Sequence, residues 1–252
     1  MNCFSVATIN LRYENDEDPY PWETRKHILK DVIAERKPDF FATQEGRQDQ
    51  LYNFASLIEE NYTLLDAHRR YDPQRMYPGL FLRRDWIVHE TWDRWLSDTP
   101  TVAGSKSFGS AWPKLALLAK VSKDPETSPI GIASFHFDNA CADARPKQAR
   151  VLVTEIRKII DVEHYFIMGD ANDSPNSETL KVVRDDGFVD PWSFSQRPIT
   201  YHGFGDKEHY ASIDYVLFDS PTFRVAGKYI DDRIDSFYSD HHYVSVTFET
   251  KI

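Results

Sequence analysis

Hydrophobic residues follow two different spacings along the chain. In four segments they recur every three or four positions, which places them on one face of a helix. This spacing predicts helices over residues 22–36, 48–60, 145–161 and 177–187. Pro38 ends the pattern of the first helix, and Gly187 supplies a C-terminal cap for the last.

Other apolar stretches are continuous or alternate with polar residues, as strands do. They predict strands over 3–10, 39–45, 79–83, 86–97, 114–122, 129–137, 164–170, 212–220, 223–231 and 242–249. A tight turn at Arg84 and Asp85 separates the third from the fourth, and the fifth and sixth are predicted to pair. Because helices and strands are interleaved, we predict an α/β (α+β) fold. Two mixed sheets pack together with helices outside, as a four-layer sandwich.

Composition limits the class of protein. The chain has 252 residues without a linker, repeat or low-complexity tract, so we expect one domain over 1–252. Hydrophobic residues make up 41%, enough for a large core, and no apolar run is long enough to span a membrane. The first residues do not resemble a signal peptide, which favours a cytoplasmic location but does not distinguish a mature secreted form. Cys3 and Cys141 fit no metal or disulfide spacing and are predicted to be buried thiols in a reducing compartment.

The net charge bears on the partners of the protein. It is −10, from 30 basic and 40 acidic residues. Such a chain has no overall attraction to a polyanion, so a nucleic-acid substrate is possible but needs a local basic patch. The acidic excess either serves solubility or includes a cation site. No obligate protein partner is evident.

The stretch FIMGDANDSP, from Phe166 to Pro175, ends a buried strand abruptly. Asp, Asn and Pro are turn formers, so a simple strand end explains it. Alternatively, Asp170 and Asn172 form part of a site that holds a metal or a water at the rim of a rigid sheet.

The same kind of polar residue occurs at or beside other predicted strands. These residues are Asn10, Glu45, His136, Asp170 with Asn172, Asp214, and Asp240 with His241. A strand fixes a side chain better than a mobile loop does, so strand ends that meet at one rim would form a compact polar cluster. Each residue alone is more often a turn or core residue, but the joint pattern favours a site.

The residue types suggest a division of labour within such a cluster. Hard cations such as Mg²⁺ prefer oxygen ligands, usually one or two carboxylates with water and phosphate. Glu45 and Asp240 suit this role. His241 and Asp214 suit a pair in which the carboxylate orients the imidazole and keeps it charged beside a phosphate.

Several segments together resemble the endonuclease/exonuclease/phosphatase superfamily, which includes DNase I-like nucleases, abasic-site endonucleases, inositol polyphosphate phosphatases and sphingomyelinases. They are TINLRYEN, PDFFATQEG, SFHFDN, FIMGDAND, SIDYVLF and YSDHHYVSV, and they span nearly the whole chain in the family's order. LRYEN, HFDN and YHGFG more narrowly resemble a bacterial subgroup of that family. The resemblance implies a DNase I-like fold and metal-dependent phosphate chemistry, but not the substrate.

The resemblance also implies a metal centre and a water-activating group. Asn10 and Glu45 fall at the first two site positions of the family, with Glu45 as a ligand of Mg²⁺ or Mn²⁺ and Asp240 as a second ligand. Asp170 would orient or deprotonate the attacking water. Asn172 would hold Asp170 and a phosphate oxygen.

The remaining positions concern the phosphoryl group. His241, oriented by Asp214, would stabilise charge on the phosphoryl oxygens. His136 would contact the phosphate and protonate the leaving oxygen. Departures from the family pattern are mild: Ala171 replaces a bulkier apolar residue, and Phe137 and Asn139 vary the histidine motif.

Substrate contacts are harder to assign. Arg12, His202 and Asp138 are predicted to contact the substrate, although His202 serves packing equally well. The segment 68–84 carries several arginines that either grip a second phosphate or form a solvated hairpin; they are Arg69, Arg70, Arg75, Arg83 and Arg84. The aromatic-rich segments 18–25 and 200–210 are candidates for the lining of a pocket. Five aromatic side chains are instead predicted to be packing residues: Trp22, Phe204, Trp92, Trp95 and Trp112.

The sequence thus predicts a Mg²⁺- or Mn²⁺-dependent phosphodiesterase or phosphatase that acts by in-line attack of water on a small or lipid-derived phosphate ester. A metal-dependent nuclease is the main alternative. A non-catalytic binding protein or a glycan-processing protein on the same fold is a weaker one, since a fold alone does not fix a function.

Overall fold

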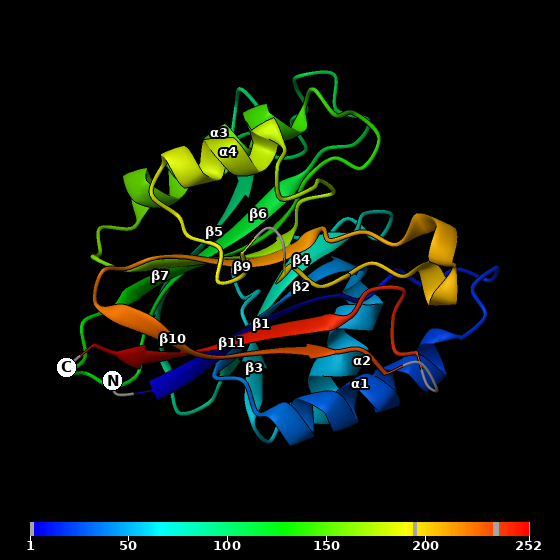
Figure 1. Ribbon diagram of the computed structural model, residues 1–252, viewed down its shortest axis with the longest axis horizontal. Coiled ribbons are helices and arrows are strands. Elements are labelled where there is room, and N and C mark those ends of the chain that lie inside the picture. Colours follow the sequence, from blue (N-terminus) through cyan, green and yellow to red (C-terminus); the bar gives the residue numbers. More distant parts are fainter. Residues whose placement is uncertain (1–2, 194–195, 234–236, 252) are drawn as a thin grey trace.

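Two β-sheets form the centre of the molecule in the computed structural model, which describes residues 3–193, 196–233 and 237–251. The six-stranded sheet has the order β10-β11-β1-β2-β4-β3, and the five-stranded sheet has the order β5-β6-β7-β8-β9 (Figure 1). The strands are β1 (Cys3–Asn10), β2 (Phe40–Gly46), β3 (Tyr62–Leu64), β4 (Tyr77–Arg83), β5 (Ile87–Trp95), β6 (Leu115–Ser122), β7 (Ile130–His136), β8 (Tyr165–Asp170), β9 (Asp214–Asp219), β10 (Phe223–Asp231) and β11 (Tyr243–Thr250).

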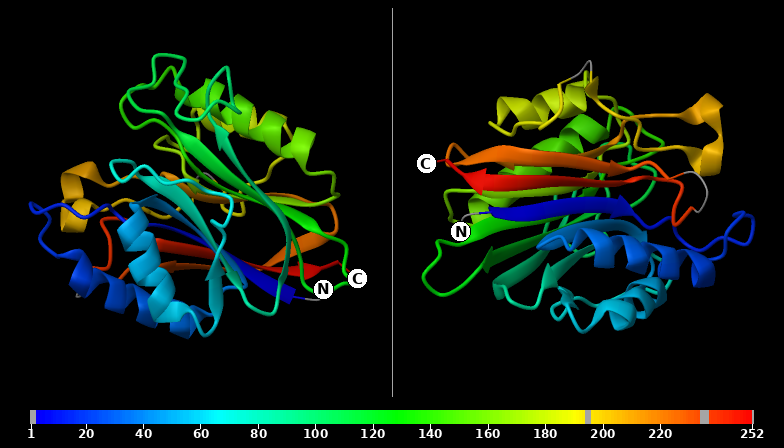
Figure 2. Two further views of the ribbon diagram at one scale, coloured as in Figure 1. Left: turned by 180° about the vertical axis from the view of Figure 1, so that it is seen from behind. Right: turned by 60° about the horizontal axis from the view of Figure 1, so that its bottom comes forward.

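Helices cover the outer faces of both sheets. Figures 1 and 2 show one pair of helices against the six-stranded sheet and the other pair against the five-stranded sheet. They are α1 (Trp22–Arg36) and α2 (Gln48–Ile58) in the first pair, and α3 (Arg145–Ile159) and α4 (Glu178–Asp185) in the second. The four layers confirm the predicted sandwich, and all four predicted helices are present with shifts of two residues or fewer at their ends.

The alternation along the strands explains the layering. In β1, Phe4 and Val6 belong to the core between the two sheets, whereas Ala7 and Ile9 belong to the core under α1 and α2. Successive side chains of a strand point to opposite faces, so one strand supplies both cores. A third core lies between the five-stranded sheet and α3 and α4.

Strand pairing brings the predicted polar strand ends together. β1 pairs with β2 in parallel, with Asn10 opposite Gln44. β7 pairs with β8 in parallel and β8 with β9 antiparallel, so that His136, Asp170 and Asp214 stand side by side across three strands. Close strand packing at this point depends on Gly169, because a Cβ there would lie 2.0 Å from the carbonyl oxygen of Phe135.

The predicted turn at Arg84 and Asp85 is present, and it carries the chain from β4 in one sheet to β5 in the other. The structure differs from the sequence-based expectations at three other points. The short strand β3 was not predicted, since three residues are too few to show a period. Cys3 is exposed and Cys141 half-buried, so neither is a buried thiol. Trp112 does not pack in the interior, since it is 64% exposed.

The helices found within the described residues include none with the length and apolar character needed to cross a membrane.

Candidate active site

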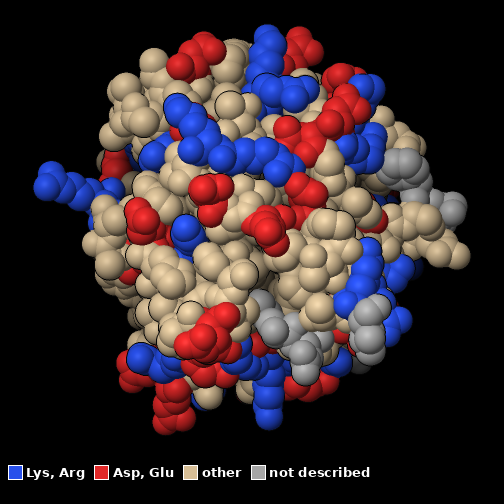
Figure 3. Space-filling model, turned by 90° about the vertical axis from the view of Figure 1, so that its left-hand side faces the viewer, with Lys and Arg blue, Asp and Glu red and all other residues tan. Residues whose placement is uncertain are grey.

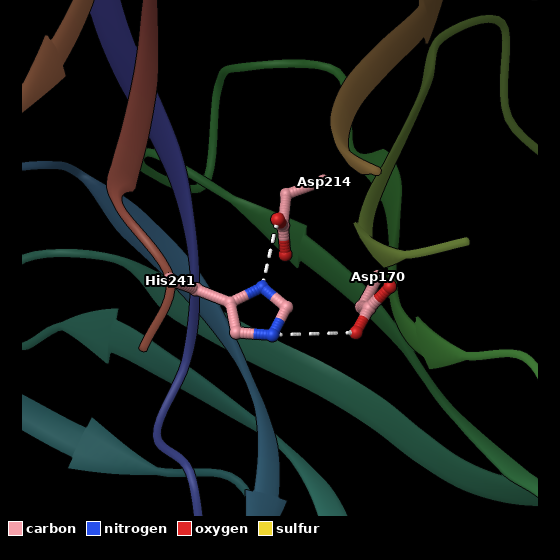
Figure 4. Close-up of side chains that lie close together, drawn as sticks. All are labelled: Asp170, Asp214 and His241. Atoms are coloured by element: carbon pink, nitrogen blue, oxygen red, sulfur yellow. Dashed lines mark hydrogen bonds and ion pairs between the residues drawn. The ribbon is translucent and has the colours of Figure 1, made fainter. Parts of the chain in front are cut away.

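The candidate site lies where the C-terminal ends of four strands meet the start of β9 and the segment before β11. Asn10, Glu45, His136 and Asp170 come from the ends of β1, β2, β7 and β8. Most residues of this rim are buried. The side chains of Asp170, Asp214 and His241 lie next to one another (Figure 4). The structure therefore brings together the polar strand ends that the sequence singled out.

Asp170 is held in one orientation by two donors. The side-chain amide of Asn10 donates to its Oδ2 at 3.1 Å, and the backbone N–H of Asn172 donates to its Oδ1 at 2.7 Å. The side chain of Asn172 is turned away and donates to the carbonyl of Phe137 at 3.1 Å. Asn172 therefore holds Asp170 through its backbone, while its amide fixes the adjacent loop.

His241 lies between two carboxylates. Its Nδ1 is 2.9 Å from Oδ2 of Asp214, and its Nε2 is 3.9 Å from Oδ2 of Asp170 (Figure 4). Burial would lower the pKa of His241, but the charge and hydrogen bond of Asp214, together with Asp240 and Asp170, raise it to about 10. His241 is thus an imidazolium at neutral pH, oriented by Asp214.

The surroundings of Asp170 make it a possible proton acceptor. Burial and the nearby charge of Asp214 raise the pKa of Asp170 to about 7, although His241 acts in the opposite direction. A carboxylate with a pKa near the working pH exchanges a proton more readily than an ordinary surface aspartate.

Glu45 and Asp240 offer oxygen atoms that form no ion pair shorter than 3.9 Å with any described residue. Within the same residues, Glu45 accepts one long hydrogen bond of 3.4 Å from the backbone of Tyr13, and Asp240 lies 3.9 Å from Nε of Arg12 and 4.0 Å from Nε2 of His241. Burial and the charge of Glu45 raise the pKa of Asp240, against the effect of His241. A half-buried carboxylate and a buried one that repel each other at one rim fit a hard divalent cation.

Local backbone geometry explains how Glu45 reaches the rim. The pairing of β2 with β4 is irregular between Thr43 and Gly46, and Glu45 has a φ of 60°. A bulge of this kind re-aims a side chain at the end of a strand. Three of the six described non-glycine residues with positive φ belong to the candidate site, namely Arg12, Glu45 and Asn172. Such strained backbone is typical of functional sites.

A second group of possible ligands is already internally paired. Asp170, Asp214 and His241 are the described residues whose ligand atoms lie within 4.8 Å of one another. Because Nδ1 of His241 bonds to Asp214 and its imidazolium is favoured, we interpret this group as a hydrogen-bonded relay and not as the metal site.

His136 faces the site without a partner. Its Nε2 is buried, makes no hydrogen bond to a described residue, and lies 3.6 Å from Asp170 and 4.0 Å from Glu45. Burial lowers its pKa well below the usual value, and the charges of Lys114 and His241 lower it further. The imidazole is therefore neutral, which suits a hydrogen-bond donor to a phosphate better than the predicted proton donor.

The Endonuclease/Exonuclease/phosphatase family matches residues 7–241 of the chain. The chain belongs to this family. No curated protein sequence gives a significant match.

Solved structures of family members have the same fold. A family protein from Bacteroides vulgatus superposes with a TM-score of 0.90 at 21% identity, covering 100% of both chains. The mannosyl-6-phosphatase of Bacteroides thetaiotaomicron gives 0.82 at 21% identity, covering 97% of this chain and 99% of that one. TDP2 of D. rerio, complexed with a single-strand DNA product, gives 0.77 at 17% identity, covering 98% of this chain and 99% of that one.

An open pocket adjoins the rim. Its volume is about 460 Å³, and its lining includes Glu45 and His136 from the candidate site. Arg12 also lines it and is held there by a bidentate ion pair with Asp18 at 2.9–3.3 Å. Arg12 is thus placed where the family resemblance expects a substrate contact.

The other two predicted substrate residues lie elsewhere. Asp138 is buried, and its two oxygens accept hydrogen bonds from the loops around Ser110 and Cys141. His202 stacks on Phe237 and His242 with ring centroids 4.9 and 4.2 Å apart, and does not line the pocket. Both side chains therefore support the fold around the site.

Most arginines of the segment 68–84 are engaged in structure. Arg69 is buried and forms a bidentate pair with Asp93 at 2.6 and 2.8 Å. Arg83 pairs with Asp39 and Asp85. Arg75 alone among the segment's arginines lines the pocket, paired with Asp72.

Three residues that shape the site were not predicted to be site residues. Trp112 and Lys114 line the pocket, although Trp112 was predicted to pack in the interior and Lys114 was predicted only to begin a strand. Arg25 is fully buried on α1, and its guanidinium donates to the carbonyls of Leu11, Arg12 and Tyr238, as well as to Tyr20. The sequence holds one signal for Arg25: it is a basic residue on the apolar face of a predicted helix.

Replacing Arg25 is expected to destabilise the protein. Arg25→Met leaves several buried carbonyls without donors, so we expect a loss of about 3 kcal/mol in the free energy of unfolding. Urea denaturation measures it, with Lys30→Met as the control because Lys30 is exposed on the same helix. Equal stability of the two variants would contradict a role for Arg25 in joining the loops after β1 and before β11.

Proposed function

We propose that the chain is a divalent-metal-dependent phosphoester hydrolase that activates water for in-line attack on a small or lipid-derived phosphate ester. One observation carries the proposal: Asp170 is fixed by Asn10 and Asn172 opposite an imidazolium, His241, that Asp214 orients. This arrangement pairs a proton acceptor with a fixed positive charge, as hydrolysis at phosphorus requires.

Side chains of this protein account for the proton that the attacking water loses and for the charge that develops on the phosphoryl oxygens. Asp170 accepts the proton of the attacking water while the oxygen bonds to phosphorus and the ester P–O bond breaks. His241 stabilises the charge on the phosphoryl oxygens. Neutral His136 donates a hydrogen bond to the phosphoryl group. Mg²⁺ or Mn²⁺ held by Glu45 and Asp240 would offset charge on a phosphoryl oxygen and on the leaving group.

The proposal favours a small substrate over a nucleic acid. The pocket of about 460 Å³ is of a size that holds a small molecule. Figure 3 shows the end of the molecule that carries the two termini, away from the rim, and Lys and Arg are interspersed with Asp and Glu there, so this face offers no broad basic surface for a nucleic acid. The mannosyl-6-phosphatase among the structural neighbours supports a phosphatase, whereas TDP2 with its DNA product supports the nuclease alternative. A nuclease would bind duplex DNA with a steep salt dependence.

The test compares a mono- and a bis-nitrophenyl phosphate side by side. We expect nitrophenol release with Mg²⁺ or Mn²⁺, and its loss when a chelator removes the metal. Glu45→Gln should weaken metal binding in a calorimetric titration, whereas Glu60→Gln should not, because Glu60 is exposed and far from the rim in the fold. Hydrolysis that persists in chelator, or metal affinity unchanged by Glu45→Gln, would contradict the proposal.

Trp112 is expected to affect substrate binding and not the chemical step. Its exposed ring lines the pocket beside the rim, where it can pack against the organic part of an ester. Trp112→Ala should raise KM by about tenfold at a constant kcat, a loss of about 1.4 kcal/mol. Trp112→Phe is the matched control and should retain most of the affinity. A fall in kcat with KM unchanged would contradict this role.

A further inference from the structure

Lys114 is a buried cation without a partner. It precedes β6, is 8% exposed, and lines the same pocket as Glu45 and His136. No hydrogen bond or ion pair joins its ammonium group to any residue within the described ranges. The side chain is largely buried, but its amino nitrogen is not among the fully buried polar atoms, so it opens onto the pocket. A cation held at a pocket wall without an acidic partner favours an anionic ligand in that pocket.

The charges around Lys114 place it at the reacting end of the pocket. Burial lowers its pKa, and the carboxylates of Glu45, Asp170 and Asp138 oppose this effect. Its own charge lowers the pKa of His136. Lys114 thus interacts with the proposed metal ligand, the proposed base and the unpartnered imidazole, although it forms an ion pair with none of the three.

A second cation of the pocket, Arg47, has no carboxylate partner among the described residues either. It lines the pocket, its guanidinium lies over the ring of Tyr13 at 5.3 Å, and its Nε is buried without a hydrogen bond. Two other arginines, by contrast, bind carboxylates: Arg69 binds Asp93, and Arg157 binds Asp186 and Asp219. In a chain with a net charge of −10, two cations without acidic partners at one pocket point to an anionic ligand.

We propose that Lys114, supported by Arg47, binds non-bridging oxygens of the scissile phosphoryl group and makes the site select phosphomonoester dianions over diesters. This inference rests on the proposed function. A monoester carries one more negative oxygen than a diester, so it gains more from a second fixed cation opposite His241. An ammonium group also suits a phosphate because it donates up to three charge-assisted hydrogen bonds.

The experiment measures binding and selectivity separately. Lys114→Met removes the charge at similar length, and Lys114→Arg keeps it. Lys120→Met is the matched control, because Lys120 is on β6, the strand that Lys114 directly precedes, but does not line the pocket. Calorimetry with inorganic phosphate on the metal-loaded proteins gives the anion affinity. The kcat/KM values for mono- and bis-nitrophenyl phosphate give the selectivity.

Lys114→Met is expected to bind phosphate about ten- to hundredfold more weakly than the wild type, while Lys120→Met is unchanged. The ratio of monoester to diester kcat/KM should fall by at least about tenfold in Lys114→Met and recover in part in Lys114→Arg. Should Lys114→Met not fold, Lys114→Gln replaces it in both measurements. A folded variant with wild-type phosphate affinity and an unchanged ratio would overturn the inference.

The same data separate this inference from the proposed function. If the wild type binds phosphate through Lys114 but hydrolyses neither ester, the hydrolase proposal fails and the anion-binding role of Lys114 is supported. If the wild type hydrolyses both esters and Lys114→Met changes neither binding nor ratio, the hydrolase proposal is supported and the role of Lys114 fails.

Discussion

Asp170→Asn is expected to lower kcat by about 10²- to 10⁴-fold while the protein still folds. The substitution keeps the shape of the side chain but removes its ability to accept a proton from water. Steady-state kinetics with a nitrophenyl ester and saturating metal measure the loss, and thermal unfolding checks the fold.

The stability of Asp170→Asn follows from two opposing effects. An amide cannot accept hydrogen bonds with both of its heavy atoms, so either Asn10 or the N–H of Asn172 loses its acceptor. At the same time the variant removes a buried charge that Asp214 repels. We therefore expect little net change in the free energy of unfolding. Asp161→Asn, an exposed aspartate shortly before β8, is the control. If Asp170→Asn, prepared free of wild-type enzyme, had the kcat of the wild type, Asp170 would not be the proton acceptor.

Much of the fold could be predicted because its signals are local. Each long strand carries its own hydrophobic pattern, and α1 to α4 carry theirs. The rim could be predicted too, since Asn10, Glu45, His136 and Asp170 each end a strand, and strand ends are set by the same patterns. What placed these four together was strand pairing, which the sequence suggested only through the family resemblance.

The rest depended on contacts between distant loops, which leave no period in the sequence. Trp112 lies in an irregular stretch that leads into Lys114 and β6, and the buried Asp138 fixes the course of this stretch by accepting hydrogen bonds from Ser110 and Ala111. Asp138 therefore resembled a substrate ligand in sequence but serves the loop in the structure. His202 was ambiguous for a related reason: only the stacking on Phe237 shows that it packs behind the rim.

His241→Ala is expected to lower kcat by about 10²- to 10⁴-fold, because it removes the imidazolium that is hydrogen-bonded to Asp214 and lies 3.9 Å from Asp170 (Figure 4). The control is His27→Ala, since His27 is exposed on α1. Kinetics with a nitrophenyl ester measure the effect. If His241→Ala kept a near wild-type kcat, the metal and the pocket cations alone would stabilise the charge on the phosphoryl oxygens.

Asp214→Asn tests the same charge through its pH dependence. In the wild type the pKa of His241 is raised to about 10, largely by Asp214 acting against burial, so the imidazolium persists from pH 6 to pH 8. Without the carboxylate, burial favours the neutral imidazole and the pKa falls. The variant should therefore lose more activity relative to wild type at pH 8 than at pH 6. An equal loss at both pH values would mean that Asp214 only orients the ring, and that the charge of His241 does not contribute to catalysis.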